Sequence, residues 1–278
     1  MTTVTGDPRI RLARALLGAV EIVPDPLLPP RVVRVVDIGG RHFVAKQHDK
    51  HARYVSELHA YRTWGSLLYG HAPELVGRHD ATRTLLLTAL AGDRAETAAP
   101  GSPEEELVHH EAGRVLGKLH RDTSMPQSGA IGAVLAQRLQ IWIERAVHDD
   151  LIDTTEQNLL SRHAAVLNSS LTESAVCHLD YQPRNWLIGD AFGICDFEHM
   201  RRDARIRDFA RLQFRRWQTA PHLRTAFLHG YGRPLNDTEL RLLESFGAIE
   251  AATALVKGHK ENDLTLSAQG RTVLSQLS

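Results

Sequence analysis

The sequence of 278 residues lacks an excess of charge, because 33 lysine and arginine residues balance 33 acidic residues. Binding to a nucleic-acid backbone requires a basic face, so this balance argues against nucleic acid as a partner. No run of about 18 apolar residues is present, and the N-terminus has no basic segment leading into an apolar one. We therefore expect no membrane partner, no signal peptide and a cytoplasmic location.

Cysteine is also scarce. The two cysteines, Cys177 and Cys195, lack the Cys-x-x-Cys spacing of metal or redox pairs. We interpret both as small buried residues of strands.

The most informative segment lies between Val176 and His199. Two short apolar runs, residues 186–188 and 193–195, flank a glycine-containing turn and predict a small β-hairpin. A hairpin brings the residue before its first strand, Asn185, next to the residue after its second, Asp196. An amide oxygen and a carboxylate are hard ligands of the kind that Mg²⁺ takes beside nucleotide phosphates.

Asp180 lies five residues before Asn185, on a loop that Pro183 keeps from becoming helix. We expect it to accept a proton from an attacking hydroxyl group without being a metal ligand. His178 is expected to support this loop through hydrogen bonds rather than act as a base.

The pattern His178-x-Asp180-x-x-x-x-Asn185, followed by Asp196-Phe197-Glu198, resembles the catalytic and metal-binding loops of the aminoglycoside phosphotransferase and choline kinase-like family. This family is related to the protein kinases, in which the corresponding Asp receives the substrate proton while the Asn and the later Asp hold Mg²⁺. The resemblance implies an α+β, protein kinase-like fold of two lobes. An N-terminal nucleotide-binding lobe, with a five-stranded antiparallel sheet and a helix, is expected over residues 1–90. A mostly helical catalytic and acceptor-binding lobe is expected over residues 91–278.

The pattern of apolar residues in the N-terminal part agrees with a lobe made of a sheet and a helix. Apolar periodicity predicts a leading helix over residues 8–18 and a second helix over His51–Trp64. Strands are predicted for residues 19–23, 31–36, 41–46, 75–78 and 84–88.

The third of these strands ends at Lys46, and lysine is rare in this chain. In the resembled family a lysine at this point contacts the α and β phosphates of the nucleotide, and Glu57 on the following helix can pair with it. The same resemblance places Ala89 and Leu90 in the hinge between lobes, where the backbone binds the nucleotide base. Backbone contacts leave ATP and GTP equally possible as donors.

One feature departs from kinases with a glycine-rich phosphate loop. The segment between the first two strands, residues 24–30, holds four prolines and no glycine. Proline has no N–H donor, so this loop cannot form a glycine-rich cradle for phosphate. Phosphate binding would then depend on Lys46 and the metal. The loop also leaves open a pseudokinase-like regulatory module that binds nucleotide without transfer.

The remaining chain is predicted to be mainly helical. Helices are predicted for residues 104–121, 131–150, 154–167, from 207 onward, 239–257 and 268–277. Asp208 matches an acidic residue that follows the metal-binding Asp in the family, and we expect it to brace the catalytic loop.

The sequence thus predicts a small-molecule O-phosphotransferase that uses Mg²⁺ and ATP or GTP. Because the chain has no acidic excess to attract polycations, we expect the acceptor to be a neutral hydroxylated compound, such as a nucleoside or macrolide antibiotic modified for self-resistance. A protein kinase is a weaker alternative, since the chain lacks an Ala-Pro-Glu element after Asp196.

Overall fold

The computed structural model describes residues 6–277, and the chain divides into two compact units. The first unit contains the residues up to Thr97 together with Pro183–Arg201, and the second contains Ala98–Gln182 and the residues from Arg202 onward. The segment with the kinase-like motif is therefore divided: Asp180 belongs to the second unit, whereas Asn185 and Asp196 belong to the first.

The first unit is built on a five-stranded antiparallel sheet with the order β1-β2-β3-β5-β4. The predicted strands and the two predicted helices of this unit are confirmed, with ends shifted by one residue or less. The elements are α1 (Pro8–Leu17), β1 (Val20–Val23), β2 (Val32–Asp37), β3 (His42–Gln47), α2 (His51–Trp64), β4 (Leu75–His79) and β5 (Thr84–Thr88).

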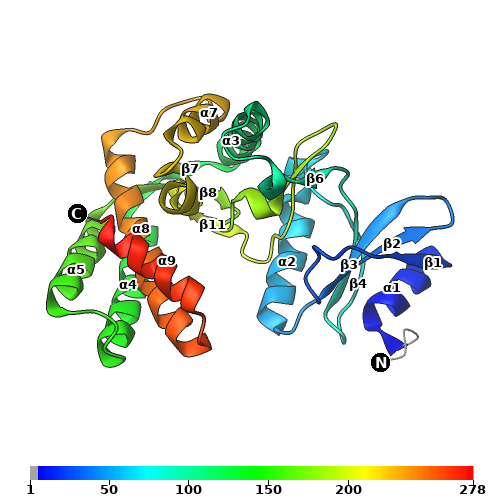
Figure 1. Ribbon diagram of the computed structural model, residues 1–278, viewed down its shortest axis with the longest axis horizontal. Helices are drawn as coiled ribbons and strands as arrows, with labels where there is room; N and C mark the ends of the chain where they lie inside the picture. Colours follow the sequence, from blue (N-terminus) through cyan, green and yellow to red (C-terminus); the bar gives the residue numbers. More distant parts are fainter. Residues whose placement is uncertain (1–5, 278) are drawn as a thin grey trace. The chain divides into compact units, whose positions relative to one another are not determined.

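Alternation along β3 separates the two faces of this sheet. Phe43 and Ala45 are buried in an apolar core that includes Ile10 of α1, which lies against the sheet in Figure 1. Because successive side chains of a strand point to opposite faces, Val44 and Lys46 point away from α1, and both line a cavity. The strand thus places the ammonium group of Lys46 on the cavity face.

A smaller sheet of the first unit contains the predicted hairpin. Its strands are β6 (Asp93–Arg94), β9 (Trp186–Ile188) and β10 (Gly193–Ile194), in the order β10-β9-β6. Gly92 makes the pairing of β6 with β9 possible. Its φ is +107°, and a Cβ atom there would lie 2.1 Å from the carbonyl oxygen of Ile188. Only glycine permits both this backbone conformation and this close approach.

The second unit is mostly helical, as expected. Helix α3 packs against α7, α4 packs against α5, and α8 packs against α9, and these pairs lie side by side in Figure 1. A three-stranded sheet, in the order β11-β8-β7, accompanies them. The elements are α3 (Pro103–Thr123), β7 (Met125–Ser128), α4 (Gly129–His148), α5 (Thr154–Ser169), β8 (Thr172–Cys177), β11 (Arg201–Ala204), α6 (Ala210–Leu212), α7 (Pro221–Tyr231), α8 (Asp237–Glu261) and α9 (Leu264–Ser275).

Two features of this unit differ from the prediction. The single helix predicted from Arg207 is a 3-10 turn (Arg205–Phe209), the short α6 and a π-helical turn (Gln213–Trp217). Asp208 and Phe209 are both buried here, so tertiary contacts override the local helical pattern. Helix α7 and the strands β7, β8 and β11 were not predicted. Among residues 6–277, no helix is long and apolar enough to cross a membrane.

Candidate active site

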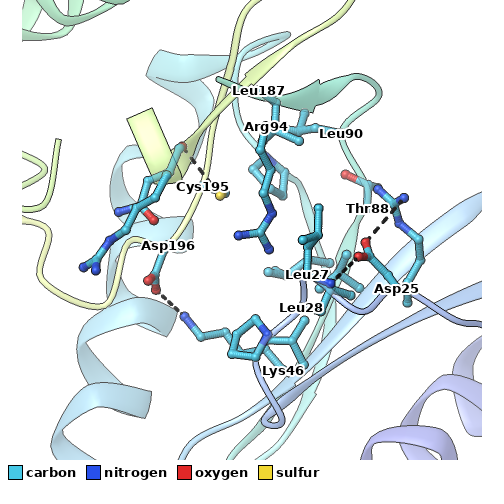
Figure 2. Close-up of a pocket in the computed structure, with 18 of the residues that line it drawn as sticks. Asp25, Leu27, Leu28, Lys46, Thr88, Leu90, Arg94, Leu187, Cys195 and Asp196 are labelled. Atoms are coloured by element: carbon cyan, nitrogen blue, oxygen red, sulfur yellow. Dashed lines mark hydrogen bonds and ion pairs between the residues drawn. The ribbon is translucent and has the colours of Figure 1, made fainter. Parts of the chain in front are cut away.

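Lys46 is the centre of the polar site in the first unit. Its side chain is only 7% exposed, and its Nζ atom lies 2.7 Å from Oε2 of Glu57 and 2.5 Å from Oδ1 of Asp196. Figure 2 shows the contact with Asp196. Burial alone would lower the pKa of Lys46, but the two carboxylates outweigh it, so the pKa is raised and the side chain is a permanent cation.

Glu57 extends from α2 toward the end of β3 and is fully buried. Burial would raise the pKa of its carboxyl group, but the positive charge of Lys46 and a hydrogen bond from His48 lower it. Glu57 is therefore an anion that orients Lys46. The pairing of Lys46 with Glu57 predicted from the sequence is present.

The hairpin brings the predicted metal ligands to one cavity. Gly193 pairs with Leu187 and Ile194 with Trp186, and beyond them the N–H of Cys195 donates to the carbonyl oxygen of Asn185 at 3.0 Å. Asp196 follows directly, and both Asn185 and Asp196 line the cavity. Asp196 has a φ of +69°, a left-handed conformation that Asp and Asn tolerate better than most residues.

The cavity has a volume of about 370 Å³ and is lined entirely by residues of the first unit. Apolar side chains of Val44, Leu87, Leu90 and Leu187 form one part of its wall, and Lys46, Asn185 and Asp196 form a polar part. A wall of this composition can bind an apolar ring system together with an anion. Figure 2 also shows Arg94, from β6, pointing into the cavity.

The two predicted hinge residues lie in different surroundings. Leu90 lines the cavity. The N–H of Ala89, in contrast, donates to the carbonyl oxygen of His42 at 3.0 Å and so extends the pairing of β5 with β3. Ala89 is not among the residues that line the cavity, and its N–H is used within the sheet.

The donor set of Asn185 and Asp196 fits a magnesium ion. It offers an amide oxygen and carboxylate oxygens, which are the ligands that Mg²⁺ takes in proteins when phosphates complete its coordination. Lys46 contacts Oδ1 of Asp196, and Oδ2 of Asp196 lies 3.8 Å from a nitrogen of Arg31.

Asp180, in the second unit, lies on the loop that follows β8, and hydrogen bonds to Asp208 stabilise this loop. The carboxylate of Asp208 accepts hydrogen bonds from the N–H groups of His178, at 2.9 Å, and Leu179, at 2.5 Å. It also lies 3.1 Å from Nε2 of His120. The predicted bracing role of Asp208 is thus confirmed. Nδ1 of His178 in turn accepts a hydrogen bond from the N–H of Asp180, at 3.3 Å, which agrees with its predicted supporting role.

Asp180 is 2% exposed, and its carboxylate has a partner that the sequence did not predict. Arg211 forms an ion pair with it, and the side chain of Gln182 donates a hydrogen bond to the same oxygen. Nε of Arg211 lies 3.6 Å from Glu250 of α8, so one guanidinium group connects the two acids. The sequence separation could have indicated this partner. Arg211 follows Asp208 by three positions, about one helical turn, and so is expected near the loop that Asp208 braces.

The prediction that both cysteines are small buried residues of strands is confirmed for Cys177 and is wrong for Cys195. Cys177 is buried in β8, and its pKa is raised by burial and by the nearby carboxylates of Asp208 and Asp203. Cys195 is partly exposed directly after β10 and lines the cavity. Burial, followed by the negative charge of Asp196, raises its pKa to about 12.

The raised pKa of Cys195 gives a first prediction. Since the thiolate is the reactive form, alkylation by iodoacetamide at pH 8 should be at least about 100-fold slower in the folded protein than in the protein unfolded in guanidinium. Peptide mapping by mass spectrometry measures the rate at each cysteine. Labelling of folded Cys195 at the rate of the unfolded chain would contradict the assigned environment.

The chain is similar to a known protein family. Residues 29–243, most of the chain, match the family model of the phosphotransferase enzyme family. No curated protein sequence matches the chain.

Solved structures show the same fold. A choline/ethanolamine kinase family protein from Mesorhizobium loti has a TM-score of 0.68 at 16% identity, covering 98% of this chain and 92% of that one. A macrolide 2'-phosphotransferase type I has a TM-score of 0.65 at 17% identity, covering 100% and 98%. The streptomycin–ATP–APH(2'')-IIa ternary complex has a TM-score of 0.65 at 14% identity, also covering 100% and 98%. The predicted kinase-like fold is confirmed.

Proposed function

Because the chain belongs to the phosphotransferase enzyme family, whose chemistry is phosphoryl transfer to small molecules, we propose that it transfers the γ-phosphate of ATP or GTP to a hydroxyl group of a small molecule. The observation that carries this proposal is the position of Lys46 between Glu57 and Asp196, in a cavity that Asn185 also lines. Solved relatives in complexes with ATP, ADP and GDP support a nucleotide as the donor.

Each side chain has a role in this proposal. Lys46, oriented by Glu57, binds the α and β phosphates, and Leu90 contacts the base in the apolar part of the cavity. Asn185 and Asp196 would hold Mg²⁺, which neutralises charge on the transferring phosphate when it is bound. Asp180 accepts the proton of the acceptor hydroxyl group. Catalysis then consists mainly of positioning and charge neutralisation.

The acceptor is proposed to be a neutral hydroxylated compound, such as a nucleoside or macrolide antibiotic, with self-resistance as the biological role. Zero net charge supports this choice, and so does the ion pair of Asp180 with Arg211. Arg215 follows Arg211 by four positions and lies 3.2 Å from the same Glu250. A polycationic acceptor bound at Asp180 would therefore meet guanidinium groups of like charge.

This reasoning predicts the order of acceptors. Neutral nucleosides and macrolides should have values of kcat/KM at least about tenfold higher than aminoglycosides, because repulsion between charges about 4 Å apart near a protein surface costs several kcal/mol. A panel of such acceptors with ATP and with GTP, analysed by mass spectrometry for the gain of one phosphoryl group, tests both the order and the activity. Aminoglycosides as the preferred acceptors would contradict the prediction.

The alternative, a nucleotide-binding regulatory module without transfer, is favoured by one observation. The proline-containing loop, residues 24–30, contributes Asp25, Leu27, Leu28 and Pro29 to the cavity wall without a glycine-rich cradle. Thermal-shift titration with Mg–nucleotide, followed by turnover against the acceptor panel, distinguishes the two. Nucleotide binding without transfer to any acceptor would favour the module.

A further inference from the structure

The backbone of the loop over the cavity has few donors left for phosphate. Residues 24–30 contain three residues other than proline, namely Asp25, Leu27 and Leu28. The N–H of Leu27 donates to Oδ1 of Asp25 at 3.0 Å, and the N–H of Leu28 donates to the carbonyl oxygen of Asp25 at 3.2 Å. Two of the three amides are therefore used inside the loop, and a phosphate bound beneath it needs another donor.

Arg31, the residue directly after the loop, lines the same cavity. One of its guanidinium nitrogens lies 3.2 Å from Oε2 of Glu198, and the other lies 3.8 Å from Oδ2 of Asp196. The second distance exceeds that of a hydrogen bond. Since Lys46 contacts the other oxygen of Asp196, the two cations approach this carboxylate from its two oxygen atoms.

Three other arginines line the cavity, namely Arg34, Arg94 and Arg184, the last of which is exposed. The first two are held by different acids. Arg34 pairs with Asp25 of the loop at 4.0 Å, and Arg94 lies 3.5 Å from Glu96. Arg31 differs from both because it shares the predicted metal ligand Asp196 with Lys46. Glu198, which anchors Arg31, is 6% exposed and is also contacted by Arg53 of α2 at 3.5 Å.

We propose that the guanidinium group of Arg31 binds the β and γ phosphates of the donor nucleotide, in place of the amides of a glycine-rich loop. A planar guanidinium group can donate two parallel hydrogen bonds to a phosphate, and it keeps its charge at every accessible pH. Glu198 holds one side of the group and Asp196 orients the other toward the end of the cavity where Mg²⁺ is proposed to bind. This inference rests on the proposed nucleotide-dependent function.

The experiment compares Arg31→Ala and Arg31→Lys with a matched control, Arg53→Ala. Arg53 contacts the same Glu198 carboxylate but does not line the cavity. Calorimetry in the presence of Mg²⁺ measures the dissociation constants of the β,γ-imido analogues of ATP and GTP, and of AMP and GMP. Thermal unfolding without nucleotide checks that each variant is folded.

Arg31→Ala should weaken binding of the triphosphate analogue that the wild type prefers by about 10- to 100-fold, as expected for charged hydrogen bonds, and leave monophosphate binding within about twofold. Arg31→Lys should recover part of the loss, and Arg53→Ala should change neither constant by more than about twofold. Unchanged triphosphate binding by Arg31→Ala, or an equal loss for monophosphates, would overturn the assignment.

The dissociation constants test the role of Arg31 independently of phosphoryl transfer, which tests the proposed function. If the wild type binds nucleotide but transfers no phosphate, the transferase proposal fails while the role of Arg31 is still decided by the binding constants. If Arg31→Ala binds the triphosphate analogue like the wild type and transfer is observed, the inference fails alone. A wild-type protein that binds neither analogue would overturn both.

Discussion

Asp180→Ala is expected to lower kcat for phosphoryl transfer by about 10²- to 10⁴-fold, the usual contribution of a positioned general base. The KM for nucleotide should change little, because Lys46, the proposed phosphate ligand, and Asp196, the proposed metal ligand, lie in the other unit of the chain. Initial rates at saturating acceptor, measured by mass spectrometry or coupled release of the nucleoside diphosphate, give both constants.

A folding defect can be distinguished from a loss of the base. The partner of Asp180, Arg211, is 23% exposed at its side chain and keeps Glu250 at 3.6 Å, so the variant does not leave an isolated buried cation. Asp190→Ala, in the exposed turn of the hairpin, is the matched control and should retain wild-type activity. Retention of more than about a tenth of wild-type kcat by folded Asp180→Ala would remove it from the role of base.

The elements of the first unit could be predicted closely from the sequence because each carries a strong local signal. The helix His51–Trp64 and the strand Thr84–Thr88 have the predicted bounds, and the hairpin around residue 190 follows from two apolar runs and a turn. The meeting of Lys46 with Glu57 and Asp196 could be predicted only with the family resemblance. Positions 46 and 196 are 150 residues apart, and no local pattern relates them.

Most features that the sequence did not predict depend on long-range contacts. Strand β8 is polar at its start, and its pairing with β7 and β11 joins distant segments. Helix α7 did carry a signal, since Pro221 is suited to its first turn and Gly232, with a φ of +89°, ends it. The sequence places Arg31 only in a strand, because its contacts with Asp196 and Glu198 cross more than half of the chain.

The two predicted hinge residues differ in a way that the sequence did not indicate. Ala89 and Leu90 are adjacent in the sequence, and both were predicted to contact the nucleotide base. The pairing of β3 with β5 runs through Phe43 and Thr88 and continues by one hydrogen bond, from Ala89 to His42. That added bond uses the N–H of Ala89, so register decides which residue of the pair reaches the cavity.

Asp196→Asn is expected to remove the effect of Mg²⁺ on nucleotide binding. In the wild type, Mg²⁺ should strengthen the binding of the preferred β,γ-imido nucleotide, because the carboxylate contributes a full negative charge to the metal site. In the variant the amide keeps the shape but not the charge, and the affinity for Mg–nucleotide should fall by about 100-fold or more. Dissociation constants measured by calorimetry with Mg²⁺ and with EDTA give the metal-dependent ratio for each protein.

Asparagine is the appropriate substitution because of the backbone at this position. Asp196 has a φ of +69°, where Asn is tolerated and Ala is strained, so the variant should fold normally. Loss of the charge also removes one ion-pair partner of Lys46, although Glu57 remains 2.7 Å from its Nζ atom.

The matched control is Asp93→Asn. Asp93 lines the same cavity from β6, and its substitution should keep the wild-type ratio of affinities with Mg²⁺ and with EDTA. An Asp196→Asn protein whose nucleotide affinity still responds to Mg²⁺ like the wild type would show that the metal is held elsewhere, and the roles proposed for Asn185 and Arg31 would need to be reassigned with it.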